Sequence, residues 1–470
     1  MKLLKLCTLI ALLMLIAFFI LRSYKASGTD YTYVYSGKSP CLIDISSDGS
    51  TLYTAGPHGI MIIDKETMDV INELPFSQLF YDGDMAIDST NEYIYCSYNE
   101  EVNGTGKMLR IRISDSQMTT IDLAPSNING FAFDDDEDYI YLVGGVWPII
   151  GEGVSWEDYT ENVGTGRVYE VELASFTVSR TANIGVDNHG VSCSNGKLII
   201  MTGEQKIRED ILTGAETSAS TCLVVAISTL EIDSEISVPP GFYNMSMKIP
   251  GTSYVMLGSD SCGYDGVGLG KLNTITEQVE NWYIVTDDVY SETIPGGGAY
   301  MMTYDDVNNK LYLTFWMGSG REFPQYRLGM VDLNTDEFTD WYFGSFMHYA
   351  DILYDKYSGK LYLTAPMDDA IVVIEPPGYN HPPIACFSFY PGEGYAPLTV
   401  TFENCSYDED GEIVSIECDW DGDEEPDEFI EGNPGVFQHT FGETGVITFI
   451  LTVVDDGGKK GTWIGTVNVQ

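Results

Sequence analysis

Two stretches near opposite ends of this chain carry almost the same pattern. The first reads Leu42-Ile-Asp-Ile-Ser46, Thr51-Leu-Tyr-Thr-Ala-Gly56 and Ile60-Met-Ile-Ile-Asp64, with a Ser-Asp-Gly turn after the first run. The second reads Asp351-Ile-Leu-Tyr-Asp355, Lys360-Leu-Tyr-Leu-Thr364 and Ile371-Val-Val-Ile-Glu375. Each is a series of β-branched and aromatic runs separated by turn-forming residues, and this pattern predicts short antiparallel strands.

Weaker copies of the same pattern lie between these two stretches. They are Met85–Asp88 with Tyr93–Tyr95, Phe131–Asp134 with Tyr139–Leu142, Val191–Met201, Met245–Leu257, and Tyr304–Asp306 with Lys310–Thr314. A unit of about 40 to 55 residues that is built from short strands is typical of a β-propeller. We therefore predict an all-β chain with a seven-bladed propeller over residues 29–377, whose blades begin near residues 41, 84, 130, 189, 244, 299 and 349.

The last repeat lacks a fourth strand, because Pro376-Pro377 follows its third. A missing outer strand would leave an open edge, which folded proteins avoid. The segment Tyr31-Thr-Tyr-Val-Tyr35 alternates as a strand and belongs to no other repeat. We predict that this N-terminal strand completes blade seven and closes the ring.

The connections between the second and third strands differ greatly in length. They are short in blades one and seven but long in blades two to six, and alternating strand direction places all of them on one face. We call these five connections the crown loops: residues 98–106, 144–166, 203–220, 259–270 and 317–326. Insertions on one face of a repeat protein mark a binding surface, although they also arise by family drift. The candidate binding residues there are Trp147, Trp156, Tyr159, Tyr264, Arg321 and Tyr326.

The repeats resemble the YVTN family of propellers. The segment Lys360-Leu-Tyr-Leu-Thr364 followed by Ile371-Val-Val-Ile-Glu375 is similar to that family's Tyr-Val-Thr-Asn and Val-x-Val-Ile-Asp pattern. The resemblance covers residues 30–377 and is strongest in blades one, six and seven. It implies a structural repeat, common in archaeal and bacterial surface proteins, and no catalytic residues.

The C-terminal region resembles a PKD domain along its whole length. The matching motifs are Pro382-Pro383-Ile-Ala385, Gly394-Tyr-Ala-Pro-Leu-Thr-Val-Thr-Phe402, Asp408-Glu-Asp-Gly411, Asp419-Trp-Asp-Gly-Asp423 and Asp455-Asp-Gly-Gly458. This resemblance implies an Ig-like β-sandwich over residues 384–470, after a linker at 378–383, with a role in adhesion, spacing or carbohydrate contacts. Cys418 stands where the family usually places a buried Trp, and we consider a bridge from Cys386 to Cys418 as one hypothesis.

The same region contains closely spaced carboxylates. Asp419, Asp421, Asp423 and Asp427 have the alternating spacing of calcium loops, which need hard oxygen ligands, and Asp408 and Asp410 could add further ligands. Position 12 of an EF-hand count is Ile430, so this is not an EF-hand. The alternative is a solvated acidic turn with Asx hydrogen bonds.

A catalytic site has little support in the sequence. His58, His189 and His348 are the only propeller histidines, and the last two lie where first strands begin, as do Asp84, Asp187 and Asp351. Such a cluster at the channel mouth could bind a metal, so an exported lactonase-, lyase- or quinoprotein-like enzyme is the alternative function. The chain has no nucleophile elbow and no phosphate loop.

Composition and the N-terminus indicate export. The chain carries 71 acidic and 23 basic residues, a net charge of -48, which disfavours nucleic acid and anionic membranes as partners. Residues 1–28 hold an apolar run between basic residues, typical of a signal peptide or a signal anchor. Asn103, Asn244 and Asn404 begin glycosylation sequons. We therefore expect an extracellular or cell-surface protein, anchored or secreted, that binds a protein or glycan and uses no cofactor except calcium.

Overall fold

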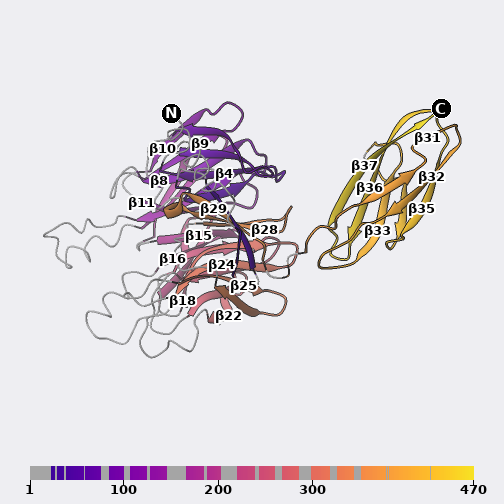
Figure 1. The fold of residues 1–470 in the computed structure, drawn as a ribbon. Helices are drawn as coiled ribbons and strands as arrows, with labels where there is room; N and C mark the ends of the chain where they lie inside the picture. Colours follow the sequence, from indigo (N-terminus) through magenta and orange to yellow (C-terminus); the bar gives the residue numbers. More distant parts are fainter. Residues whose placement is uncertain are drawn as a thin grey trace, which may run out of the picture. The chain divides into compact units, whose positions relative to one another are not determined.

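The computed structural model divides the chain into two compact units, Met1–Pro376 and Pro377–Gln470 (Figure 1). The structure describes residues 23–26, 29–35, 39–57, 59–75, 84–99, 106–123, 127–145, 166–184, 188–202, 220–238, 243–259, 267–284, 298–317, 325–342, 351–376, 378, 380–423 and 425–470. These ranges contain no helix that is long and apolar enough to cross a membrane.

In the described residues, the first unit consists of seven antiparallel sheets. The first three are β3 (Leu42–Ile45), β4 (Thr51–Gly56), β5 (Gly59–Asp64) and β6 (Val70–Pro75); β7 (Met85–Ile87), β8 (Tyr93–Asn99), β9 (Gly106–Arg112) and β10 (Met118–Leu123); and β11 (Asn127–Phe133), β12 (Tyr139–Gly145), β13 (Arg167–Glu172) and β14 (Thr177–Asn183). The next two are β15 (Asn188–Ser194), β16 (Lys197–Thr202), β17 (Ser220–Ala226) and β18 (Glu231–Val238); and β19 (Tyr243–Lys248), β20 (Tyr254–Ser259), β21 (Val267–Asn273) and β22 (Gln278–Ile284).

The last two sheets complete the unit. They are β23 (Gly298–Asp305), β24 (Lys310–Met317), β25 (Gln325–Asp332) and β26 (Glu337–Tyr342); and β27 (Asp351–Asp355), β28 (Lys360–Ala365) and β29 (Ala370–Ile374), with the 3₁₀ turn η2 (Pro366–Asp368) between β28 and β29. The first strand of each sheet begins close to the start that the repeats predict. The predicted all-β architecture is therefore confirmed at the level of its sheets.

The N-terminal strand β2 (Thr29–Tyr35) joins the last sheet, as the sequence predicts. It runs antiparallel to β29, and the pairing extends from Tyr31 opposite Ile374 to Tyr35 opposite Ala370. A further strand, β1 (Ser23–Ala26), lies outside β2 and lies within the segment assigned to the leader. The N-terminal part of the unit and its last repeat therefore share one sheet, and β27 of that sheet contacts β3 of the first.

The aspartates that end the first strands of several blades close the following turns. Oδ1 of Asp134 accepts hydrogen bonds from the N–H groups of Asp138 (2.8 Å) and Tyr139 (3.0 Å). Asp88 makes the equivalent pair of bonds with the N–H groups of Glu92 and Tyr93. Asp305 instead accepts from the N–H groups two and three residues further on, as in an Asx turn. In each case the carboxylate closes the turn, so this recurrent aspartate has a structural role.

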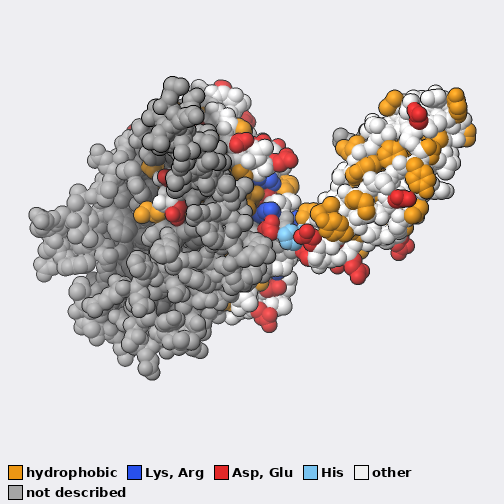
Figure 2. Space-filling view, viewed as in Figure 1, with side chains coloured by type: hydrophobic (Ala, Val, Ile, Leu, Met, Phe, Trp, Pro, Cys, Tyr) orange, Lys and Arg blue, Asp and Glu red, His pale blue; other side chains and the backbone are white. Residues whose placement is uncertain are grey.

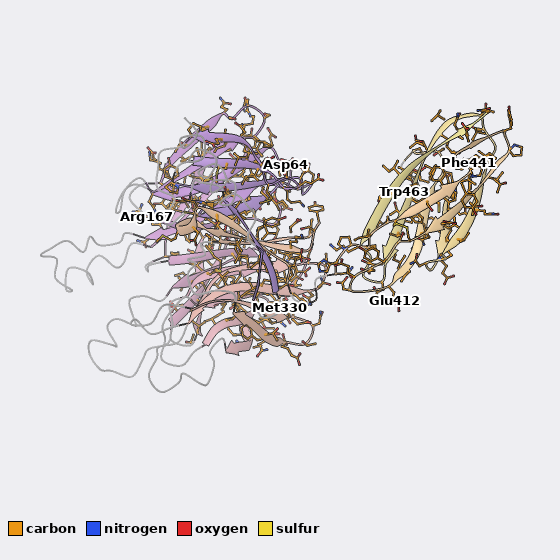
Figure 3. All side chains as sticks on the ribbon, viewed as in Figure 1. Asp64, Arg167, Met330, Glu412, Phe441 and Trp463 are labelled. Carbon is orange, nitrogen blue, oxygen red and sulfur yellow. A yellow bond between two sulfur atoms is a disulfide. The ribbon has the colours of Figure 1, made fainter. Side chains whose placement is uncertain are left out.

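The second unit is built from two sheets around one core. The sheets are β30 (Phe387–Tyr390), β32 (Leu398–Asn404) and β35 (Val436–Phe441); and β31 (Glu393–Gly394), β37 (Lys460–Val469), β36 (Gly445–Asp455), β33 (Ile413–Asp419) and β34 (Glu428–Glu431). Phe402 and Phe449 are fully buried, and each comes from a different sheet. Figure 3 labels Phe441 and Trp463, which also come from opposite sheets and pack against Phe449.

The disulfide of the second unit differs from the bridge considered from sequence. Cys386 is bonded to Cys405, whereas Cys418 is a free thiol buried in the core. The N–H of Cys405 also donates to the carbonyl of Cys386 (2.8 Å), so backbone pairing already brings these two cysteines together. The hypothesis of a Cys386–Cys418 bridge is therefore wrong, because Cys386 lies beside Cys405 while Cys418, on a strand of the other sheet, is buried in the shared core.

Gly49 gives a prediction about the seam between the first and last sheets. Its φ of +72° is one that L side chains rarely adopt, and a Cβ there would lie well inside van der Waals contact with the ring of Tyr357. Gly196 has the same φ in the equivalent turn of the fourth sheet, with nothing within 4 Å. We expect Gly196→Ala to lower the free energy of unfolding by about 1–2 kcal/mol from backbone strain alone.

Gly49→Ala should lower it further, by an additional ~1–3 kcal/mol from overpacking at the seam. Urea denaturation of both variants measures the difference, and Tyr357→Ala should recover part of the Gly49→Ala loss. Equal effects of the two glycine substitutions would show that the Tyr357 contact is not tight.

Candidate functional site

The innermost strand of each sheet has a hydrogen-bonding edge with no strand beside it. Buried or half-buried N–H groups on such an edge need acceptors from elsewhere. Aspartates on neighbouring innermost strands supply them. Oδ2 of Asp351 on β27 accepts from the N–H of Ile43 on β3 (3.0 Å), and Oδ2 of Asp44 on β3 accepts from Ile87 on β7 (2.8 Å).

Each of these carboxylates also uses its second oxygen. Oδ1 of Asp351 accepts from Ile352 (2.8 Å), and Oδ1 of Asp44 accepts from Ile45 (2.7 Å). Asp84, just before β7, accepts from Met85 (2.9 Å) and from the backbone of Phe131 on β11. The three carboxylates therefore link the last, first, second and third sheets in sequence around the inner wall.

A hydroxyl performs the same role at another seam. The N–H of Tyr354 on β27 donates to Oγ1 of Thr303 on β23 (2.9 Å). The positions are regular when they are counted back from the turn residue at the end of each first strand (Ser46, Asp88, Asp134, Asp305 or Asp355). The acceptor stands four or two residues before that turn residue, and the donor in the next sheet stands three or one residue before its own. Sequence analysis singled out Asp84 and Asp351 as strand-start residues but missed Asp44 and this linking role. The sequence signal that could have revealed this role was an Asp or Thr at either of those two positions in a repeat.

Burial changes the acidity of these groups. It raises the pKa of Asp351 to about 8 and those of Asp44 and Asp84 to about 6, against the backbone hydrogen bonds, which lower them. The charges of Asp84 and Asp44 raise the pKa of Asp351 further. Desolvation is the largest cause in all three groups, so their ionised forms are costly at this wall.

The side chains of the histidines predicted at the channel mouth are not among the described residues. His58, His348 and Asp187 lie outside the described residues, and only the backbone of His189, on β15, is described. Across the described ranges, the one group of carboxylate, imidazole or thiolate side chains close enough to hold a metal is in the second unit. The described channel carboxylates thus act as acceptors for backbone N–H groups.

The crown loops are the second candidate site. The candidate residues Trp147, Trp156, Tyr159, Tyr264 and Arg321 lie outside the described residues. Tyr326 belongs to β25, where its backbone pairs with Trp316. The sequon residue Asn103 is also outside the described residues, and Asn244 lies on β19 with only its backbone described.

The third sequon residue is well placed in the structure. Nδ2 of Asn404, the atom that would carry a glycan, donates to Asn433 Oδ1 (2.5 Å) and to the carbonyl of Pro434 (3.1 Å). Its Oδ1 accepts from the N–H of Ser406 (2.9 Å). A glycan on Asn404 would have to replace these contacts.

The acidic turn between β33 and β34 brings together three of the predicted calcium ligands. Carboxylate oxygens of Asp419, Asp421 and Asp423 lie within 4.8 Å of one another. Asp427 instead accepts from the N–H of Trp420 (2.7 Å), which fixes the shape of the turn. Burial raises the pKa of Asp421, as do the charges of Asp423, Asp427 and Asp419, so the turn concentrates negative charge.

Asp408 and Asp410 are not part of this turn. They precede β33, whereas Asp419 ends it, so the seven residues of the strand separate the two groups by roughly 20 Å. Asp410 accepts from the N–H of His381 (3.2 and 3.0 Å). Both carboxylate oxygens of Asp408 are buried without a hydrogen-bond partner, and burial raises its pKa, as does the nearby charge of Asp410.

Comparison with solved structures shows the fold of the first unit. The chain is similar to the β-propeller domain of Cps50 (Swd1) from Myceliophteria thermophila, with a TM-score of 0.52 and 10% identity over 75% of this chain and 99% of that domain. It is also similar to a chain of the mitotic checkpoint complex, with a TM-score of 0.51 and 8% identity over 75% of this chain and 90% of that one. These likenesses show a β-propeller fold. No protein-family model and no curated protein matches the sequence.

The raised acidities predict how stability depends on pH. Asp351, Asp44 and Asp84 have folded-state pKa values of about 8, 6 and 6, above the ordinary 3.8. A raised folded-state pKa contributes stability that is fully present below pH 4 and is lost as pH rises through 6 to 8. The melting temperature should therefore fall by several degrees between pH 5 and pH 8.

Asp351→Asn removes the most strongly shifted group and keeps its shape. This variant should be less stable at pH 5, because its amide nitrogen replaces one acceptor, and its pH dependence should be flatter. Asp69→Asn, at an exposed turn position, is the control and should keep the wild-type slope. Thermal melts followed by circular dichroism measure both slopes, and parallel curves for all three proteins would contradict the assignment.

Proposed function

We propose that this is an exported, non-catalytic cell-surface protein that binds a protein or glycan partner through the crown loops. The observation that carries the proposal is a difference in length between the connections at the two ends of each second strand. Turns after the first strands are short and hydrogen-bonded, whereas long connections separate β12 from β13 (Gly145 to Arg167) and β16 from β17 (Thr202 to Ser220). Long connections at one edge of a rigid scaffold are typical of binding surfaces.

The channel carboxylates favour this function over a propeller enzyme of the lactonase, lyase or quinoprotein type. Each oxygen of Asp44 and Asp351 already accepts a backbone N–H from its own or the next sheet. A metal ligand or general base would be directed at a substrate, whereas one oxygen of each carboxylate is directed at the N–H of the next sheet and the other at its own strand. The described inner wall is thus used for holding blades together.

The second unit supports a spacer or adhesion module of the PKD type. Its two sheets share one aromatic core, and its disulfide is compatible with an oxidising exterior. Figure 2 shows acidic side chains over its described surface, in keeping with the acidic chain as a whole. Together with the YVTN-like repeats and the apolar N-terminal run, these features support attachment to, or secretion from, a cell surface.

Aromatic crown residues should carry most of the binding. We expect the triple variant Trp147→Ala, Trp156→Ala, Tyr159→Ala to lose at least tenfold in affinity, because aromatic anchors dominate recognition surfaces. A glycan array probed with the full exported region, followed by titration of the best ligand, measures the loss. Phe429→Ala is the matched control, since Phe429 is 67% exposed in the second unit. Equal binding by the triple variant and wild type would contradict the proposal.

Calcium binding at Asp419, Asp421 and Asp423 is the proposed cofactor role. Calcium at 100 times its dissociation constant should stabilise the second unit by ~2.7 kcal/mol. Asp421→Asn with Asp423→Asn should abolish the calcium-dependent rise in melting temperature and the heat of titration in the full chain. Asp408→Asn tests the second acidic group separately. If no variant changes the response, or if wild type shows none, the turn is a solvated acidic turn.

A further inference from the structure

One face of the larger sheet in the second unit is open to solvent. Side chains alternate along its two central strands, β36 and β37 (Figure 1), and those such as Phe449 and Trp463 pack into the core. The residues between them point away from the core. We call these outward residues the threonine face: Val446, Thr448, Ile450, Thr452 and Val454 of β36, and Thr462, Ile464, Thr466 and Asn468 of β37.

The register of the two strands makes the threonine face a regular array of β-branched side chains. Its directly opposed pairs are Thr448 with Thr466, Ile450 with Ile464, and Thr452 with Thr462. The hydroxyl oxygens of Thr452 and Thr462 are 3.2 Å apart and share a hydrogen bond. Val446 is 74% exposed and Ile464 is 62% exposed, so apolar side chains meet water between the threonine hydroxyls.

The threonine face differs in charge from the chain as a whole. The chain carries 71 acidic residues and a net charge of -48, yet the threonine face contains no ionisable side chain. Lys460, which precedes it on β37, pairs with both carboxylate oxygens of Glu417 on β33 (2.8 Å each), so these two charges offset one another. Like-charge repulsion opposes contact between two copies of such an acidic chain, and it is weakest where a surface carries no charge.

The chemistry of the threonine face favours another sheet as its occupant. Small ligands bind in concave sites lined by aromatic side chains, whereas this surface is a sheet face with no aromatic side chain on it. Two sheets pack face to face about 10 Å apart by interleaving their outward side chains. A second copy of the chain offers the same surface, and a two-fold axis would place the two faces against one another.

The sheet face is large enough for a weak dimer. β36 and β37 pair over ten residues, and β33 and β34 extend the sheet on one side. With about 3.4 Å per residue and ~4.8 Å between strands, these four strands cover roughly 500 Å². Two copies would bury about 1,000 Å² in total, which is the lower limit for a specific interface and fits a dissociation constant in the micromolar range.

We propose that the threonine face is a self-association surface through which two copies of this chain form a dimer. The row of Ile450 and Ile464, which is partly exposed in one copy, would be covered by the second copy. This contact goes beyond the proposed function, because a dimer presents two sets of crown loops and would bind a surface that carries many ligands with increased avidity.

The oligomeric state of the full exported region tests this proposal. Sedimentation velocity at increasing protein concentration should show a monomer–dimer equilibrium in the micromolar range for wild type. Ile464→Glu and Thr466→Glu each place a charge on the threonine face, and each should raise the dissociation constant of the dimer at least tenfold. Thermal melts confirm that each variant is folded.

Val436→Glu is the matched control. Val436 is 60% exposed on β35 of the other sheet, close to the 62% of Ile464, and it is also β-branched. This variant should dimerise like wild type. Equal weakening by Ile464→Glu and Val436→Glu would overturn the proposal in favour of general repulsion between acidic chains. A wild type that stays monomeric up to several hundred micromolar, or a dimer that persists in both face variants, would also overturn it.

The response to salt separates this contact from an ion-paired one. The acidic turn at residues 419–423 borders the threonine face, because a Cβ on Gly422 would lie 3.5 Å from Cβ of Thr448. Salt screens the repulsion between two acidic copies, so raising its concentration should strengthen the dimer. Dissociation of the dimer by salt would show a contact held by opposite charges on another surface, and it would overturn the proposal.

Discussion

Closure of the ring is the constraint on which the rest of the first unit depends. The pairing of β2 with β29 joins segments more than 300 residues apart, and it must offset the entropy of closing that loop. Other contacts strengthen the same seam: Asp369 accepts from Ser39, Thr364 donates to the carbonyl of Cys41, and Lys65 pairs with buried Asp355. In the described residues, the main strand contacts between the other sheets join neighbours in sequence, so the seam is where the unit is most dependent on long-range interactions. One ion pair, Lys248 with Asp135, also joins the fifth sheet to the third.

The inner wall shows a compromise between hydrogen bonding and desolvation. The innermost strands leave N–H groups that need acceptors. Asp44 and Asp351 provide two acceptor oxygens each, and Asp84 accepts from Met85 and from the backbone of Phe131. A carboxylate is a strong acceptor, but its burial beside two other carboxylates is costly at neutral pH. Thr303 performs the same linking role without a charge. The three carboxylates stand on the last, first and second sheets, so this electrostatic strain is concentrated beside the closure seam.

The repeats predicted the features that depend on local pattern. Strand positions, turn residues and the assignment of Tyr31–Tyr35 to the last sheet all follow from alternation and from the missing fourth strand. Contacts between different repeats were not predictable in this way. The partner of Asp44 is the N–H of Ile87, a group defined by the packing of two sheets rather than by spacing. The bridge from Cys386 to Cys405 likewise depends on which strands pair in the second unit.

In the second unit, the length of one strand determines which acidic residues lie close together. Sequence spacing suggested one group of ligands, but Asp408 and Asp410 precede β33 whereas Asp419 ends it, so the length of the strand separates them. Within each group, turn geometry then sets the role. Asp427 and Asp410 accept N–H groups that fix the turn or the linker. Asp421 and Asp423 are exposed, although each also accepts one N–H from within the turn. The same distinction applies in the propeller, where the recurrent aspartates close turns or link sheets. Carboxylates fixed by backbone donors are part of the scaffold. In the proposed function, recognition therefore uses positions that the repeat leaves free, in the crown loops.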